Sequence, residues 1–544
     1  MKEFIYNPII KGFNPDPSIV RVKEDYYIAT STFEWFPGVQ IFHSKDLLNW
    51  ELVSRPLNRR KQIDLKGVPD SGGIWAPDIS YKDGKFYLAY TIVRTHKSIW
   101  RDMHNFLTTS DSISQGWSDA VFLNSSGHDP AFFHDTDGKS WLLNVEWKYA
   151  NGKNYFNGII IQEYSLEKKI LIGQKYNIFK GTEAGFTEGP HLYRRNGYYY
   201  LITAEGGTWY DHCVTIARSN NLFGPYEIYS DNPILTSKNN KALKLQKTGH
   251  ADLVESHHGK WYLVHLCGRP ITKSRCCVMG RESAIQEIKW SSDGWPISVN
   301  SKKEPSVKVE LPTHVRKIQL NNSFIDEFNE DKLNINFQTL RVPLGKNKFS
   351  LKSRKGHLRL IGQESLSSLH YQSLVAVRQQ SFCYISETMV EFEPSSTGHM
   401  AGLVVYYNTE NYYYLCMSYN SQIGKILRLI TCNKNILLEP TRDGLLIENN
   451  SKIGLRITVN NEKGQFYYST DEKNWLKIGE LLDMSKLSDD YIGGKAFTGT
   501  FIGICCQDLT GENKYADFDY FKYEEFDLNP ISYTHFNQAN CQTK

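Results

Sequence analysis

Short apolar runs separated by polar turns fill the first 300 residues, and the same plan recurs five times. Each copy opens with an acid and a short apolar run, crosses a polar turn that often contains glycine, and continues into an aromatic-rich run. In the first copy these parts are residues 16–20, 23–25 and 26–29. Two such runs joined by a short polar turn predict a β-hairpin. The opening acids of the five copies are Asp16, Asp78, Asp129, Glu188 and Asp252.

The spacing of the copies predicts how the hairpins assemble. They recur about every 50 to 60 residues, which indicates the blades of a β-propeller rather than a helical solenoid. We therefore expect a five-bladed propeller over residues 1–300. Because the first strand of every blade lines the central channel, the five acids are expected near one mouth of that channel. Any one of these acids alone would more often be a strand-end or turn residue.

The pattern changes beyond the fifth copy. Residues 301–322 are rich in lysine and are interrupted by Pro305 and Pro312, which is typical of a linker. Residues 323–544 return to alternating apolar runs without the blade motif, and they predict a two-sheet antiparallel β-sandwich of the jelly-roll or lectin-like type. The whole chain is therefore expected to be all-β.

Composition and charge narrow the class of function. The net charge is +4 without any basic block, so we expect no nucleic-acid partner. No run approaches the roughly 20 apolar residues of a membrane span, and the N-terminus shows no apolar signal core, so no membrane partner is expected either. The ten cysteines show no zinc-ligand spacing. Without an export signal, reduced thiols and a cytoplasmic location are expected.

A channel mouth lined by carboxylates and aromatic rings suits glycoside hydrolysis. One acid protonates the leaving oxygen, while a carboxylate activates water or attacks the anomeric carbon. Aromatic faces can stack on the C–H face of a sugar, although each such ring is more often part of a core. The aromatic residues near the repeated acids are Phe33, Trp35, Phe36, Trp75 and Trp209, of which Trp75, beside Ala76-Pro77-Asp78, is the best placed.

Six short motifs resemble those of glycoside hydrolase family 43, and most closely those of its two-domain β-xylosidases. They are residues 14–18, 75–78, 128–133, 187–191, 249–255 and 280–286. Each motif is weak by itself, whereas six in order at matching spacing are specific. The resemblance covers nearly the whole chain, and it implies a five-bladed propeller, a following β-sandwich and an inverting mechanism.

The resemblance also implies roles for the repeated acids. Asp16 matches the general base that activates water, Glu188 the general acid, and Asp129 the third carboxylate that tunes the pKa of the acid and orients it. An inverting enzyme needs its acid and base ~6.5–9.5 Å apart to admit water. Asp78 and Asp252 match no catalytic role and are expected to belong to the scaffold.

Six further residues form the substrate-binding set that we predict, with Phe33 and Trp75 as aromatic walls. Arg281 resembles the arginine that contacts the non-reducing-end xylose, with a structural ion pair as the alternative. His250 resembles the histidine of the central channel, which approaches calcium in parts of the family and water or sodium elsewhere; a core histidine is the alternative. No cofactor is expected to be required. In close relatives a sandwich phenylalanine closes the pocket, and both Phe497 and Phe501 fit that description.

The function implied is removal of β-1,4-linked xylose from the non-reducing end of xylo-oligosaccharides, with inversion. An α-L-arabinofuranosidase or a dual-activity enzyme on the same scaffold is an alternative, as is an invertase-like retaining enzyme. A non-catalytic sugar-binding propeller would be expected to lack one of the three acids, and all three are present here. Relatives of this kind also imply a homo-oligomer, either a dimer or a tetramer.

Overall fold

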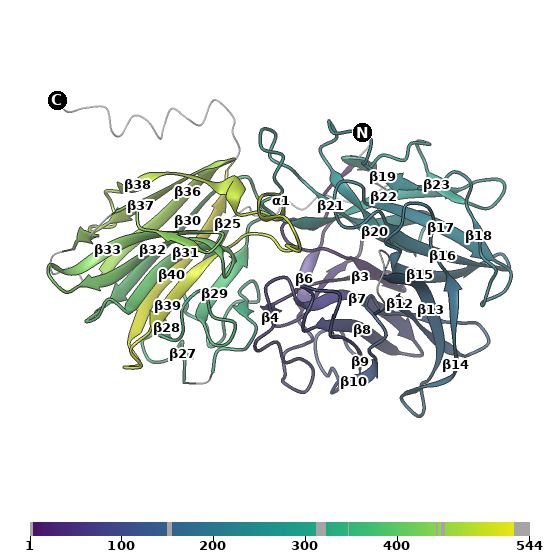
Figure 1. The fold of residues 1–544 in the computed structure, drawn as a ribbon, viewed down its shortest axis with the longest axis horizontal. Helices are drawn as coiled ribbons and strands as arrows, with labels where there is room; N and C mark the ends of the chain where they lie inside the picture. The colour runs from purple at the N-terminus through teal and green to yellow at the C-terminus, as the bar shows by residue number, and fades with distance from the viewer. Residues whose placement is uncertain are drawn as a thin grey trace.

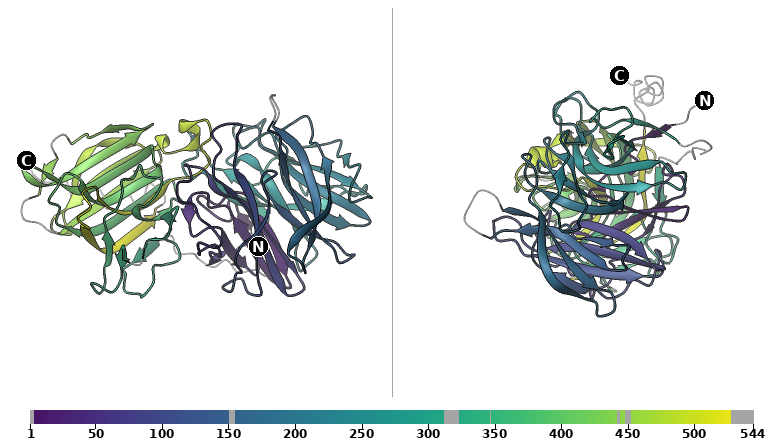
Figure 2. Two further views of the ribbon diagram at one scale, coloured as in Figure 1. Left: turned by 60° about the horizontal axis from the view of Figure 1, so that its bottom comes forward. Right: turned by 90° about the vertical axis from the view of Figure 1, so that its right-hand side faces the viewer.

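The computed structural model describes residues 4–149, 155–311, 323–345, 347–441, 444–447 and 452–526. Within these ranges the chain is β-structure, apart from a short 3-10 helix η1 (Met484–Lys486) and a single-turn helix α1 (Asp489–Ile492). A propeller, purple to teal in Figure 1, lies beside a sandwich, green to yellow, and the left view of Figure 2 shows the same arrangement. The predicted all-β fold is confirmed. No helix in the described ranges has the length and apolar character needed to cross a membrane.

Five antiparallel sheets in the described N-terminal part form the blades, each built from consecutive strands. Blade 1 contains β2 (Ser18–Val22), β3 (Asp25–Thr30), β5 (Gln40–Ser44) and β6 (Glu51–Ser54). Blade 2 contains β7 (Gly73–Lys82), β8 (Lys85–Val93), β9 (Met103–Ser110) and β10 (Val121–Asn124). Blade 3 contains β11 (Ala131–His134), β12 (Ser140–Trp147), β13 (Phe156–Ser165) and β14 (Ile170–Phe179). Blade 4 contains β15 (Glu188–Arg195), β16 (Tyr198–Glu205), β17 (Cys213–Ser219), β18 (Glu227–Ile228) and β19 (Leu235–Thr236). Blade 5 contains β20 (Gln246–Glu255), β21 (Trp261–Gly268), β22 (Arg281–Trp290) and β23 (Pro296–Ser298).

The first strand of each blade faces the centre, and these inner strands contact one another around the ring. The N-terminal segment fastens onto blade 5, because Asn7 donates from Nδ2 to the carbonyl of Ile285 at 2.7 Å. In addition, β1 (Phe4–Tyr6) pairs with β24 (Lys308–Glu310). The expected linker, residues 301–322, therefore contains a paired strand, and its residues 312–322 lie outside the described ranges.

Two sheets pack face to face in the second domain. One contains β25 (Ser323–Asp326), β27 (Phe349–Ser350), β28 (Leu358–Ile361), β30 (Cys383–Phe392), β36 (Lys452–Asn460), β37 (Lys463–Ser469), β38 (Leu476–Asp483) and β40 (Tyr515–Glu525). The other contains β29 (Ser373–Arg378), β31 (His399–Asn408), β32 (Asn411–Asn420), β33 (Gly424–Asn433), β34 (Ile436–Leu438), β35 (Leu445–Leu446) and β39 (Phe501–Asp508). Inward-facing apolar residues such as Leu403, Leu455 and Phe518 fill the space between the sheets, as alternating strands require.

A second apolar cluster joins the two domains. In it Trp35 of the propeller stacks on Phe501 of the sandwich, with ring centroids 3.6 Å apart. Beside them, β4 (Trp35–Phe36) pairs with β26 (Thr339–Leu340) across the domain boundary. Both contacts fix the sandwich against blade 1, next to one mouth of the propeller channel.

Each inner strand has a residue with a positive φ, between 30° and 56°, before the strand in blades 1 and 3 and within it in blades 2, 4 and 5. A short apolar run follows it, and we call this conformation the positive-φ turn. These residues are Asp16, Ala76, Asp129, Gly189 and His250. A positive φ is costly for residues other than glycine, and such strain is found most often at functional sites. The turn therefore gives a structural reference point for comparing the blades.

Candidate active site

A pocket of about 350 Å³ lies at the channel mouth beside the sandwich. It is lined by all five blades and by the sandwich loop that follows α1. The lining includes Asp16, Phe33, Trp75, Arg101, His128, Asp129, Phe156, Phe186, Glu188, Trp209, His212, His250, Arg281 and Phe497. A larger groove of about 800 Å³ lies between blades 1 and 2 and the sandwich, but no carboxylate lines it. The smaller pocket, with Asp16, Asp129 and Glu188 in its lining, is therefore the candidate for acid–base chemistry.

The five repeated acids do not occupy equivalent places, which corrects the expectation that all of them lie at the mouth. Counted from the positive-φ turn, Asp16 and Asp129 are at the turn and Glu188 is one residue before it. These three line the pocket. Asp78 and Asp252 come two residues after the turn, one step along the inner strand. The pocket acids thus form a mouth layer, and the later positions (Ser18, Asp78, Ala131, His191, Asp252) form a channel layer.

Asp16 is buried and surrounded by donors. Arg281 donates from Nη1 to Oδ1 at 3.0 Å, and Ser31 donates from Oγ to Oδ2 at 2.7 Å. His250 Nδ1 lies 3.5 Å from Oδ1. Burial alone would raise the pKa of Asp16, but Arg281, His250 and Ser31 outweigh it, so the pKa lies below its usual range. Asp16 is therefore held as a carboxylate.

The pKa values of Asp129 and Glu188 are raised, whereas that of Asp16 is lowered. Burial, followed by the charge of Asp16, raises the pKa of Glu188 to about 7. Burial also raises the pKa of Asp129 to about 7, with His128 opposing the shift and Glu188 adding to it. Asp129 accepts a hydrogen bond at 3.0 Å from the backbone N–H of Gly189, the residue that follows Glu188. Asp129 thus fixes the backbone on which the Glu188 side chain is carried.

Among the polar pocket residues that the sequence left without a role are His128 and Arg101. His128 Nε2 lies 3.4 Å from Glu188 Oε2, and burial lowers the pKa of His128. Arg101 lies with its guanidinium 4.0 Å from the centre of the Trp147 ring. His128 could have been noticed because it directly precedes Asp129, whereas Arg101 lies in a loop between β8 and β9 without any repeated motif.

The aromatic wall of the pocket comes from both domains. Phe33, Trp75 and Phe497 contact one another, with ring centroids 5.7 to 6.4 Å apart. Phe497 lines the pocket, whereas Phe501 does not: it is fully buried on Trp35 in the interdomain cluster. The expectation that Phe501 binds substrate is therefore wrong, and the alternative left open between the two phenylalanines falls on Phe497.

Of the three other aromatic residues noted in the sequence, two are core residues and one lines the pocket. Trp35 and Phe36 are buried in cores rather than exposed to the pocket. Trp209 does line the pocket. Two further pocket rings, Phe156 and Phe186, pack edge to face with centroids 5.5 Å apart, and Phe186 could have been noticed from its place two residues before Glu188.

The channel layer is a closed hydrogen-bond network, which agrees with the scaffold role expected for Asp78 and Asp252. Asp252 accepts from Ile19 N at 2.7 Å and from the hydroxyl of Tyr193, which joins blade 5 to blades 1 and 4. Asp78 accepts from Phe132 N at 2.9 Å, which joins blade 2 to blade 3. His191 Nδ1 lies 3.5 Å from Asp78. Burial opposes protonation of His191, but Asp252 and Asp78 raise its pKa to about 9.

Two groups of side chains in the described residues could hold a metal ion. They are Asp78, His191 and Asp252 in the channel layer, and His128, Asp129 and Glu188 at the mouth, with ligand atoms within 4.8 Å of one another in each group. Neither includes His250, and burial lowers the pKa of His250 to about 4. The calcium that the family resemblance allows near His250, with water or sodium as alternatives, stays untested.

Comparison with known proteins identifies the family of the chain. Residues 5–296 match the model of glycosyl hydrolases family 43, and residues 325–524 match the β-xylosidase C-terminal concanavalin A-like domain. A β-xylosidase of Bacillus subtilis (strain 168) is 49% identical over 532 residues, which are 96% of this chain and 99% of that protein. The chain belongs to glycosyl hydrolases family 43. The predicted family, the lectin-like sandwich and the class of enzyme, a glycoside hydrolase, are thereby confirmed.

Two further proteins resemble the chain over nearly all of its length. Xylosidase/arabinosidase 43B of Humicola insolens is 45% identical over 95% of this chain and 97% of that protein. The crystal structure of xylan β-1,4-xylosidase from Bacillus halodurans C-125 superposes with a TM-score of 0.93 at 47% identity, covering 96% of this chain and all of that one. The match spans both domains, so it includes the residues of both that line the pocket.

Proposed function

We propose that the protein is an inverting exo-acting β-xylosidase that removes β-1,4-linked xylose from the non-reducing end of xylo-oligosaccharides. The observation that carries the proposal is the division among the mouth carboxyls. The pKa of Asp16 is lowered, while burial and the charge of Asp16 raise the pKa of Glu188 to about 7. Carboxyl groups whose environments separate their pKa values take the two roles of base and acid.

In this mechanism Asp16 accepts a proton from water as the water attacks the anomeric carbon. Glu188, protonated near neutral pH, donates its proton to the leaving oxygen. Asp129 orients Glu188 through the Gly189 amide and shares its electrostatic environment. Arg281 holds Asp16, and Phe33, Trp75 and Phe497 provide apolar faces for the terminal xylose. A pocket bounded by the sandwich suits single end residues rather than the interior of a polymer.

The stereochemistry of the first product tests this mechanism. Proton NMR during early hydrolysis of 4-nitrophenyl β-xyloside, which releases a single sugar, should show α-xylose appearing before mutarotation mixes the anomers. Sustained formation of β-xylose would contradict inversion and support an invertase-like retaining reaction. Measurable binding of xylobiose without turnover would instead support a non-catalytic sugar-binding protein.

A second candidate is α-L-arabinofuranosidase activity in the same pocket. The name of the Humicola insolens relative includes both activities, and arabinofuranose presents hydroxyls similar to those of xylopyranose. The ratio of kcat/KM for the nitrophenyl β-xyloside and α-L-arabinofuranoside separates the two. A ratio well above one supports the xylosidase, and a ratio below one supports the alternative.

We also propose a homo-oligomer. Ile436, Leu437 and Leu438 of β34 and Leu476 and Leu481 of β38 are each more than half exposed. β34 pairs with β33, and β33 and β38 lie at the end of the sandwich away from the propeller (Figure 1). Exposed apolar patches of this kind mark contact surfaces, and a second copy of the chain offers the same patch. Sedimentation as a dimer or tetramer, converted to monomer by Leu437→Glu, would support this, and a monomeric native protein would contradict it.

A further inference from the structure

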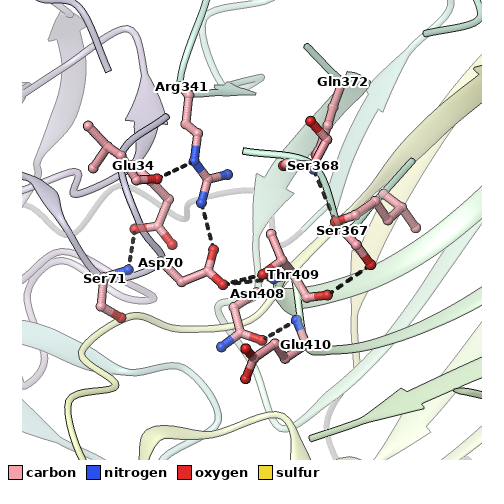
Figure 3. Close-up of polar contacts among 12 residues, drawn as sticks. Glu34, Asp70, Ser71, Arg341, Ser367, Ser368, Gln372, Asn408, Thr409 and Glu410 are labelled. Atoms are coloured by element: carbon pink, nitrogen blue, oxygen red, sulfur yellow. Dashed lines mark hydrogen bonds and ion pairs between the residues drawn. The ribbon is translucent and has the colours of Figure 1, made fainter. Parts of the chain in front are cut away.

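A buried polar cluster lies at the domain boundary outside the pocket. It consists of Glu34 and Asp70 from the propeller and Arg341 and Thr409 from the sandwich (Figure 3). Arg341 is 2% exposed, and Glu34 is fully buried. Removing one member of a buried charged cluster is strongly destabilising, although such clusters rarely increase stability over apolar packing. The cluster therefore invites an explanation beyond stability.

Two loops of the sandwich hold the loop that contains Asp70. Arg341 donates from Nη2 to Asp70 Oδ1 at 2.6 Å and from Nε to the carbonyl of Val68 at 2.7 Å. Thr409, in the turn between β31 and β32, donates to Asp70 Oδ2 from its amide at 3.2 Å and from its hydroxyl. Figure 3 shows the Arg341 guanidinium joined to Asp70, with Thr409 on the far side of Asp70. Asp70 is thus tied to the sandwich at both carboxylate oxygens.

The residue after Asp70 connects the cluster to the pocket. Ser71 accepts at its carbonyl from Trp75 Nε1 at 3.0 Å and at its Oγ from Phe497 N at 3.0 Å. Its own amide donates to Glu34 Oε2 at 3.2 Å. Ser71 therefore fixes an aromatic wall residue from each domain, and its backbone has a positive φ of 61°. A residue in this strained conformation depends on its surroundings to hold it there.

We infer that Asp70, Arg341 and Thr409 are positioning residues for the sugar-binding wall, acting through Ser71 on Trp75 and Phe497. In this arrangement the sandwich contributes to the pocket in two ways: directly with Phe497, and indirectly by fixing the propeller loop that carries Ser71. Small displacements of a binding wall reduce binding and catalysis even when the chemistry is far away. The inference rests on the proposed function only where its test uses a xyloside.

Matched substitutions separate positioning from general stability. Thr409→Val removes one buried hydroxyl hydrogen bond in the cluster. Thr388→Val removes a comparable one inside the sandwich, where Thr388 donates to the carbonyl of Tyr520 at 2.6 Å. Thr409→Val should raise KM for a nitrophenyl xyloside about fivefold, because one hydrogen bond is worth ~1 kcal/mol. Its kcat should change less, and Thr388→Val should leave KM unchanged at a similar loss of melting temperature.

A double-mutant cycle tests the route through Ser71. Ser71→Ala removes the acceptor for Phe497 N and should raise KM by itself. If Thr409 acts through Ser71, the double variant should show a smaller rise than the product of the two single effects, because residues in one network are not additive. Fully multiplicative effects would overturn the inference.

A spectroscopic measurement tests the positioning without any substrate. In protein labelled with 5-fluorotryptophan, the Trp75 fluorine signal is assigned by its loss in Trp75→Phe. Thr409→Val and Arg341→Met should shift this signal, while Thr388→Val should not. An unshifted Trp75 signal together with an unchanged KM in Thr409→Val would overturn the inference. If Arg341→Met fails to fold, Thr409→Val alone decides; if native protein hydrolyses no xyloside, the proposed function fails while the fluorine signal still tests the positioning.

Discussion

The mouth-layer acids Asp16, Asp129 and Glu188 lie only two or three residues before the channel-layer positions of the same blades, yet the carboxylates of the two layers have different surroundings. In the channel layer, Asp252 accepts from a backbone amide and a tyrosine hydroxyl, and His191 lies close to both channel carboxylates. At the mouth, Glu188 has a single polar contact among the described residues, His128 at 3.4 Å. Asp78 and Asp252 accept from backbone amides of neighbouring blades and hold the ring together, whereas Glu188, with one side-chain contact, keeps the pKa of about 7 that suits an acid catalyst.

Removing the base should give the largest effect on activity. Asp16→Asn keeps the shape of the side chain but cannot accept a proton from water. We expect kcat on xylobiose to fall by about 10³- to 10⁴-fold, the upper part of the range for a general base. Steady-state kinetics measures the loss. The melting temperature should fall, because the buried Arg281 loses its carboxylate partner, so kcat is measured well below the unfolding transition. A variant with near-native kcat would contradict the assignment.

Removing the acid should give a loss that depends on the leaving group. Glu188→Gln should reduce kcat/KM on xylobiose by about 10²- to 10³-fold but affect a dinitrophenyl xyloside far less, because that leaving group needs little protonation. In the native enzyme kcat/KM should decline above pH 7, since the pKa of Glu188 is raised to about 7 by burial and Asp16. Equal losses on both substrates would argue against Glu188 as the acid.

Much of this arrangement follows from the sequence, because the hairpin motif recurs with its turns intact and places Asp16, Asp129 and Glu188 in the same region. The division into layers was missed because the acids were aligned by charge. Aligned on the turn, Asp16-Pro17 matches Ala76-Pro77, and Asp78 then falls two residues later. Arg101 and the Asp70–Arg341 pair could not be found this way, since they depend on loops and on domain packing that no repeat encodes.

A substitution in the channel layer should reduce folding stability while leaving activity nearly unchanged. Asp252→Asn cannot accept from both Ile19 N and the Tyr193 hydroxyl in the same way, so a buried donor loses its partner. The expected cost is about 1–3 kcal/mol of unfolding free energy, measured by urea denaturation. The kcat/KM of the folded variant should remain within about threefold of native. A large loss of activity without a loss of stability would erase the distinction between the layers.

The smallest expected effect is a gain in unfolding free energy when Glu188 at the mouth is replaced by glutamine. The pKa of Glu188 is raised from 4.5 to about 7, first by burial and then by Asp16. Because the folded protein holds this proton more tightly than the unfolded chain, Glu188 lowers stability progressively as pH rises from about 4.5 to about 7. Glu188→Gln removes this penalty. The variant should match the native protein near pH 4.5 and exceed it by on the order of 1–3 kcal/mol at pH 8 in urea unfolding. An equal stability difference at both pH values for Glu188→Gln would contradict a raised pKa of Glu188 at the mouth.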